Sequence, residues 1–312
     1  MKTLVLGAGG IGGYYGGRLA QAGCDVTFLV RARRREQLAA EGLRLESPLG
    51  NAVLEVKTVL AEAVRPDYDL VLFTCKAYDL DSAMEAIAPA MRDGVTLLPL
   101  LNGLAHFAKL DARFGRANVL GGTAHINATL RRDGVVVHGD RLQRIIYGER
   151  DGGSSPRVEA IAAELARSAI DSRLSQDIEQ DLWEKLVFLS ALAATTCLFR
   201  ANVAEINAAP GGREAMERAY NANAEIARRE GREPRAAARS AGIERLTDPS
   251  GLWSASMLRD LESGGRVEAD HIVGWMLDRA RAHGVDDTIL SLAYTHLKAY
   301  EARRDAKRLP AG

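Results

Sequence analysis

The stretch "LVLGAGGIGG", residues 4–13, determines how the first part of the chain folds. A short β-branched run ends in glycine here and leads directly into a helix-like segment at residues 12–23. Gly7, Gly9 and Gly12 therefore stand in the G-x-G-x-x-G register between a strand and a helix. Such glycines allow a tight turn, and the helix N-terminus attracts a pyrophosphate. The context predicts a dinucleotide site, with a purely structural glycine-rich turn as the alternative.

The same turn supplies the first candidate cofactor contacts, which are Gly7, Gly9, Gly10, Ile11 and Gly12. Three further glycines follow within the helix-like segment, and we expect them to serve helix–sheet packing rather than ligand contact. They are Gly13, Gly16 and Gly17.

The end of the second predicted strand indicates which dinucleotide is bound. An NAD site usually has Asp or Glu at this point, whereas this chain has Arg31 in "FLVRARRR". A guanidinium suits a 2′-phosphate, so the sequence predicts NADP rather than NAD. Lys76, at the end of "DLVLFTCK", is a second candidate for a cofactor phosphate, with a solvated strand-end lysine as the alternative. Most of Arg33–Arg35 is expected to be a solvated helix start.

The chain changes character near residue 174. Before it, strand-like and helix-like segments alternate, which predicts a parallel sheet covered on both faces. Residues 131–140 and 142–149 are predicted to be two paired strands late in this part. After it, only long helical patterns follow. We therefore predict a Rossmann-like α/β domain at 1–174 and an all-α domain at 175–312.

Composition excludes several classes of protein. The 312 residues contain 41 basic and 41 acidic side chains, so no excess of positive charge predicts a nucleic-acid partner. No segment has the length and flanks of a membrane span, and none resembles a signal peptide. The three cysteines are far apart, which favours reduced thiols and a cytoplasmic location. The six histidines are scattered, so we predict no metal.

Lys185 stands directly before the most apolar helix-length segment of the chain, within "QDLWEKLVFLSALAATTCLF" at residues 180–199. The fourteen residues after it carry no charge. A lysine beside an apolar wall has its charged form disfavoured, which brings its pKa towards a range useful for proton transfer. The alternative is a lysine whose ammonium extends from the helix to water.

Segments along nearly the whole chain resemble the ketopantoate reductase (2-dehydropantoate 2-reductase) family. They are "GAGGIGGYYGGRLAQAG", "LVR", "CKAYD", "LLNG", "LWEKL", "SASMLRD" and "VEADHIVGWMLDRARAHGV", in the family's order. The resemblance implies a Rossmann-like domain, a helical domain and NADPH-dependent reduction of a 2-oxo acid, with ketopantoate to pantoate as the family reaction in pantothenate biosynthesis.

The resemblance also assigns roles to individual residues. Lys185 in "LWEKL" matches the catalytic lysine, which would donate a proton to the oxygen formed by hydride transfer. Asn102 in "LLNG" would orient this lysine and hold a cofactor or substrate group, although Asn-Gly is also a common turn. Glu268 in "RVEADHI" would accept from a substrate hydroxyl and hold Lys185 electrostatically. Ser256 in "SASM" matches a serine that contacts the substrate carboxylate.

The chain departs from the family pattern along the lysine's helix. The family commonly has asparagines four and eight residues after the lysine, where this chain has Leu189 and Ala193. Losing hydrogen-bonding groups favours a less polar 2-oxo acid or 3-hydroxy acid as an alternative substrate. A non-catalytic NADP-sensing protein is a third hypothesis. The helical domain could also bury an apolar face in a homodimer.

Overall fold

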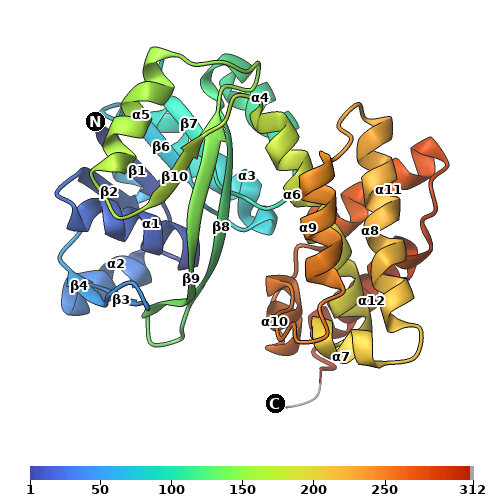
Figure 1. Cartoon of the computed structure of the whole chain (residues 1–312). Helices are drawn as coiled ribbons and strands as arrows, with labels where there is room; N and C mark the ends of the chain where they lie inside the picture. Colours follow the sequence, from blue (N-terminus) through green and yellow to red (C-terminus); the bar gives the residue numbers. More distant parts are fainter. Residues whose placement is uncertain (310–312) are drawn as a thin grey trace. The chain divides into compact units, whose positions relative to one another are not determined.

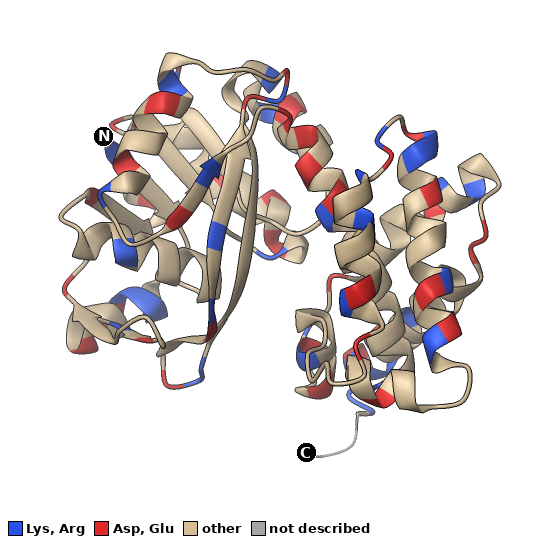
Figure 2. Ribbon diagram, in the orientation of Figure 1, with Lys and Arg blue, Asp and Glu red and all other residues tan. Residues whose placement is uncertain are grey.

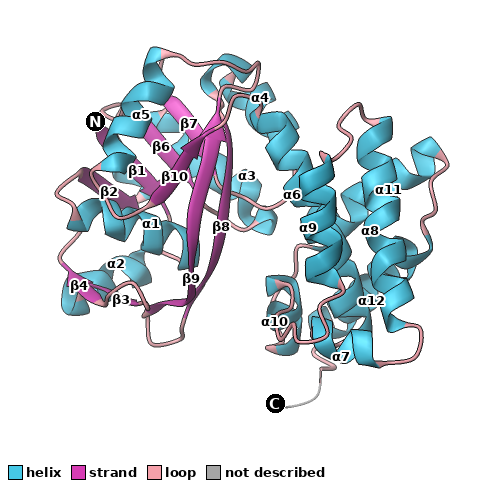
Figure 3. Cartoon of the chain, in the orientation of Figure 1, coloured by secondary structure: helices cyan, strands magenta, loops and turns pink. Residues whose placement is uncertain are grey.

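The computed structural model of the chain describes residues 1–309, which form two compact units. The first consists of residues 1–101 and 106–179, and the second of residues 102–105 together with the described residues from 180 onward. All named strands belong to the first unit, and the second is built of helices (Figures 1 and 3). The predicted fold class, Rossmann-like α/β followed by all-α, is confirmed.

The division differs in detail from the predicted boundary between 174 and 175. Residues 175–179 lie with the first unit, and Asn102–Ala105 belong to the second. The short inserted segment joins the helices because Asn102 bonds to Lys185 and Gly103 lies against His271.

The first sheet is parallel throughout and carries the glycine-rich turn at its centre. Its order is β5-β2-β1-β6-β7. The strands are β1 (Lys2–Leu6), β2 (Asp25–Leu29), β5 (Lys57–Val59), β6 (Leu70–Phe73) and β7 (Thr96–Pro99). β6 and β7 are buried along their full length, as expected for a parallel sheet covered on both faces.

Helix α1 (Gly10–Gln21) packs closely between two sheets because its glycines have no side chain. A Cβ at Gly16 would lie 2.7 Å from the ring of Phe28 in β2, and one at Gly17 would lie 3.0 Å from a methyl of Leu45 in the second sheet. The packing role predicted for these glycines is confirmed.

The second sheet corrects the prediction for residues 131–149. It contains β3 (Leu43–Glu46), β4 (Ala52–Leu54), β8 (Gly121–Leu130), β9 (Val136–Gly148) and β10 (Asp171–Leu174). The two predicted paired strands are wrong: most of both segments is the single strand β9, and its antiparallel partner is β8. Residues 131–135 form the turn between them, because Asp133 and Gly134 favour a turn more strongly than the flanking apolar residues favour a strand.

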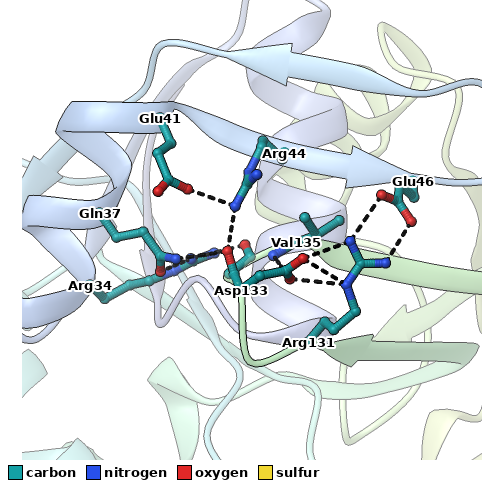
Figure 4. A network of polar contacts seen from close by, with 9 residues as sticks. Arg34, Gln37, Glu41, Arg44, Glu46, Arg131, Asp133 and Val135 are labelled. Atoms are coloured by element: carbon teal, nitrogen blue, oxygen red, sulfur yellow. Dashed lines mark hydrogen bonds and ion pairs between the residues drawn. The ribbon is translucent and has the colours of Figure 1, made fainter.

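Figure 4 shows how this turn is held. The Asp133 carboxylate accepts hydrogen bonds from Arg131, and Arg131 also pairs with Glu46 in β3. The Asp133 carbonyl accepts from Gln37 of helix α2 (Ala32–Glu41) at 2.9 Å and from Arg44. Because these contacts join three separate elements, the β8–β9 hairpin is fixed against α2.

The remaining helices of the first unit are α3 (Leu80–Ile87), α4 (His106–Phe114) and α5 (Pro156–Ala166). The second unit contains α6 (Ile178–Phe199) from its third residue on, α7 (Val203–Ala208), α8 (Gly212–Arg229), α9 (Ala236–Leu246), α10 (Ser256–Glu262), the π-helical turn η5 (Asp270–Gly274), α11 (Trp275–His283) and α12 (Thr288–Asp305). Each unit has its own apolar core.

Helix α6 is long and apolar enough to cross a membrane by length and composition alone. However, 67% of its most apolar window is buried inside the structure, as in the core helix of a helical unit. Basic and acidic residues are interspersed along the ribbon of each unit, in keeping with the balanced composition (Figure 2).

Candidate active site

The glycine-rich turn has one packed side and one open side. Gly7 has a φ of +87°, a conformation that favours glycine, and its N–H donates to the carbonyl of Leu29 at 2.8 Å. A Cβ at Gly12 would lie 2.2 Å from the Gly7 carbonyl oxygen and 2.4 Å from Thr74 Oγ1. A Cβ at Gly9 would meet nothing within 4 Å. These are the properties of a turn that a pyrophosphate can approach closely, so the residues fit a dinucleotide.

The other two turn residues predicted to contact the cofactor lie in the first turn of α1. A Cβ at Gly10 would lie 2.6 Å from the carbonyl oxygen of Ala128 in β8, so this glycine also allows close packing. Ile11 packs against the core of the unit. The first turn of α1 contains no acidic residue, so no side chain of that turn opposes an anion at the positive end of the helix dipole.

Arg31 and Lys76 lie just beyond the ends of the two strands that flank β1. Arg31 is the N-cap residue of α2, and Lys76 follows β6. The Arg31 guanidinium forms an ion pair with Asp79, with 3.1 Å between Nη2 and Oδ2. Sequence reasoning did not identify Asp79 as a site residue, although it closes the quoted motif "CKAYD".

The arginines that follow Arg31 differ in exposure and in bonding. Arg33 and Arg35 are exposed, as predicted for a solvated helix start. Arg34 is not: it is partly buried, and its Nη1 donates to Gln37 Oε1 at 2.7 Å and to the Gly134 carbonyl at 3.0 Å (Figure 4). Arg34 therefore belongs to the hairpin network.

In the helical unit, Lys185, Asn102 and Glu268 form one electrostatic group. Lys185 Nζ donates to Asn102 Oδ1 at 3.2 Å, across 83 residues of sequence. Burial lowers the pKa of Lys185 from 10.5 to about 8, although the negative charge of Glu268 acts to raise it. Glu268 is itself buried, with 5% of its surface exposed. The three residues that the resemblance joined in one role are therefore neighbours in the structure, while their catalytic role stays a prediction.

The turn of α6 that carries Lys185 is anchored on its other side by Arg235. The Arg235 side chain and backbone N–H both donate to Glu184, at 2.6–2.8 Å, and its Nη2 also donates to Asp181. Burial acts to raise the pKa of Glu184, but the hydrogen bonds from Arg235 hold it below its ordinary value. Glu184 stands beside Lys185 in the motif "LWEKL", but no feature of the sequence indicated Arg235 as its partner.

The turn after Asn102 packs against His271. Gly103 has a φ of +80°, and a Cβ there would lie 2.9 Å from His271 Cδ2 and 3.1 Å from its carbonyl oxygen. His271 belongs to η5, three residues after Glu268, and π-helical turns often occur at functional sites. The close contact holds Asn102 where its amide reaches Lys185.

Ser256 is the first residue of α10. Its neighbour Ala255 donates a weak hydrogen bond of 3.4 Å to Thr196 Oγ1, on α6. Thr196 lies 11 residues beyond Lys185, which is about 16 Å along a helix. The structure therefore leaves the predicted substrate contact of Ser256 as a prediction.

The two departures from the family pattern differ in exposure. Leu189 is partly exposed, whereas Ala193 has no exposed surface and belongs to the core. Asn202, further along, does not replace the missing amides, because it caps α7 and accepts from the Glu205 backbone N–H at 2.9 Å. Among residues 1–309, no group of three or more potential metal ligands occurs.

Comparisons with known proteins agree along the whole chain. The family model "Ketopantoate reductase PanE/ApbA" matches residues 3–152, and the model of its C-terminal part matches residues 177–301. The uncharacterised oxidoreductase YkpB of Bacillus subtilis is 34% identical over 304 residues, covering 97% of this chain and 100% of that protein. The 2-dehydropantoate 2-reductase of Halobacterium salinarum is 29% identical, covering 91% and 94%. The crystal structure of a PanE/ApbA family ketopantoate reductase from Ralstonia eutropha aligns with a TM-score of 0.88 at 26% identity, covering 98% and 100%.

Proposed function

Because the chain belongs to the ketopantoate reductase family of oxidoreductases, which use a nicotinamide cofactor, we propose that it reduces a 2-oxo acid with NADPH and that Lys185 is the general acid. The family reaction, ketopantoate to pantoate in pantothenate biosynthesis, is the first to test. Family membership also argues against the hypothesis of a non-catalytic NADP sensor.

The observation that carries this proposal is the partly buried Lys185 ammonium beside Asn102 and Glu268. Surface lysines remain protonated well above neutral pH and are poor proton donors there. The pKa of about 8 places Lys185 where it is still charged at neutral pH but releases its proton more readily.

The mechanism assigns one task to each of these residues. When bound, the nicotinamide supplies the hydride that reduces the substrate carbonyl. Lys185 donates its proton to the carbonyl oxygen as negative charge develops there. Asn102 accepts from the lysine and fixes the direction of Nζ, while the Glu268 carboxylate keeps the ammonium charged until the proton is needed. Gly7–Gly12, Arg31 and Lys76 would hold the cofactor.

The pH dependence of turnover follows from the Lys185 pKa. The protonated lysine is required for reduction, so kcat for reduction should fall as pH rises through about 8. Oxidation of the hydroxy acid requires the neutral amine, so kcat for oxidation should rise through the same pH. Steady-state rates in both directions measure this, and a reduction rate that stays flat from roughly pH 7 to 10 would contradict Lys185 as the acid.

A second candidate substrate is a 2-oxo acid with an apolar side chain, which the exposed part of Leu189 favours. A leucine cannot pair with a substrate hydroxyl, and an unpaired polar group loses affinity when buried. We expect Leu189→Asn to raise kcat/KM for ketopantoate relative to 2-oxoisovalerate by about tenfold.

A matched control for this prediction is Leu198→Asn, which is also partly buried on α6. It lies nine residues further on, about half a turn away in direction, so the substrate ratio should not change. If the Leu189 variant leaves the ratio unchanged as well, Leu189 does not contact the substrate.

Two further proposals concern the oligomeric state of the enzyme and its location in the cell. We propose a homodimer formed through the helical unit, where Phe199, Leu252 and Leu292 are exposed apolar side chains. We also propose a cytoplasmic location, which the scattered cysteines support.

A further inference from the structure

The Arg31–Asp79 ion pair crosses the end of the central strand. β2 and β6 are the two neighbours of β1 in the first sheet. Arg31 follows β2 and Asp79 follows β6, so the pair joins the loops on either side of the point where β1 runs into the glycine-rich turn. In an open parallel sheet, dinucleotides bind at this edge, beyond the carboxyl ends of the strands.

The backbone on both sides of the pair is fixed to the turn. The Gly7 N–H donates to Leu29 O at the end of β2. Thr74 Oγ1, just after β6, donates to Leu6 O at 2.6 Å. These two bonds hold the ends of β2 and β6 against β1, so the loops that carry Arg31 and Asp79 both start at the glycine-rich turn.

The two side chains are unequally anchored. The Arg31 side chain is 81% exposed, whereas that of Asp79 is 30% exposed. Asp79 is the N-cap residue of α3, a position where aspartate usually bonds to the helix N–H groups, yet its side chain makes no capping hydrogen bond. Its carboxylate instead pairs with Arg31, whose exposed side chain can reorient toward another anion.

We infer that Asp79 is a specificity-determining residue that competes with the 2′-phosphate of the cofactor for Arg31. The inference rests on the proposed use of NADPH. A 2′-phosphate must break the ion pair with Asp79 before it can pair with the Arg31 guanidinium, and this lowers its affinity. A ribose hydroxyl meets no such penalty, since a carboxylate can accept its hydrogen bond. Asp79 thereby limits the preference for the phosphorylated cofactor.

Asp79→Asn tests this inference, because asparagine keeps the size and the N-cap preference of aspartate. Calorimetric titration with 2′,5′-ADP and with 5′-AMP measures the contribution of the 2′-phosphate without turnover. The variant should bind 2′,5′-ADP about fivefold more tightly and 5′-AMP no more tightly than the wild type. The gain should shrink at high salt.

Asp81→Asn is the matched control. Asp81 lies in the first turn of α3 and pairs with Lys109 at 2.7 Å, so its loss changes the local charge equally but leaves Arg31 untouched. An equal gain in 2′,5′-ADP affinity in both variants would show that the change in local net charge is the cause, and it would overturn the inference. No gain in the Asp79 variant would overturn it as well.

The double variant Arg31→Ala/Asp79→Asn separates competition from simple repulsion. If Asp79 acts through Arg31, removing it in the Arg31→Ala background should change 2′,5′-ADP affinity by less than about twofold. A gain of the same size with and without Arg31 contradicts competition. The single variant Arg31→Ala tests the proposed NADPH site separately: unchanged affinity for 2′,5′-ADP would refute that site, whatever Asp79 does.

Discussion

Replacing Lys185 by alanine is expected to lower kcat for 2-oxo acid reduction by about 10² to 10⁴, because the developing negative charge on oxygen loses its proton donor. NADPH affinity should stay within about twofold of the wild type, since the Gly7–Gly12 turn, Arg31 and Lys76 lie in the other unit. Single-turnover rates together with NADPH titration separate the two quantities.

Lys185→Arg is the informative companion to this variant. Arginine keeps the positive charge but does not release its proton near neutral pH, so it should rescue little of the lost rate. Lys109→Ala, at an exposed lysine paired with Asp81, controls for loss of a positive charge elsewhere. Lys185→Ala with more than half of the wild-type kcat would rule out the lysine as the acid.

Gly12→Ala is expected to abolish cofactor binding and destabilise the first unit. The new Cβ would lie 2.2 Å from the Gly7 carbonyl oxygen, which is backbone that cannot move without opening the turn. Overpacking of this kind costs about 1–3 kcal/mol or more. We expect a lower melting temperature and no measurable NADPH binding by calorimetry.

Gly9→Ala separates the loss of cofactor binding from the loss of stability. Gly9 has an extended backbone with φ −86°, and its Cβ would enter open space, so the melting temperature should not change. NADPH affinity should still fall, because the methyl group occupies the open side of the turn that the pyrophosphate would approach. Unchanged affinity in the Gly9 variant would show that the cofactor does not use this side.

Local patterns were sufficient for much of the fold but not for long-range pairing. The glycine register and the alternation of strands and helices predicted the central sheet, because parallel strands buried on both faces appear as apolar runs. The second sheet was missed in part, since β8 and β9 are each buried at one end and more exposed elsewhere, and their turn at Asp133 looked like strand sequence. Strands β4 and β5 lie close together in sequence, yet they belong to different sheets.

Contacts between residues distant in sequence also could not be predicted at the candidate site. The apolar stretch after Lys185 indicated a perturbed pKa from sequence alone, because burial is the first cause of the shift. Its contact with Asn102 depends on a segment that leaves the first unit, which no local pattern encodes. The pair between Arg31 and Asp79 likewise joins residues 48 apart, although each was visible in its own motif.

Deuteride transfer from NADPH that carries deuterium at both positions of nicotinamide C4 tests the central claim most directly. With the wild-type enzyme and a 2-oxo acid, proton and deuterium NMR should find one deuterium at C2 of the 2-hydroxy acid for each NADPH oxidised. The rate of labelling should fall by about 10² or more in Lys185→Ala. NADPH oxidation without deuterium at C2, or equal labelling rates in the two proteins, would contradict reduction of a 2-oxo acid with Lys185 as the acid.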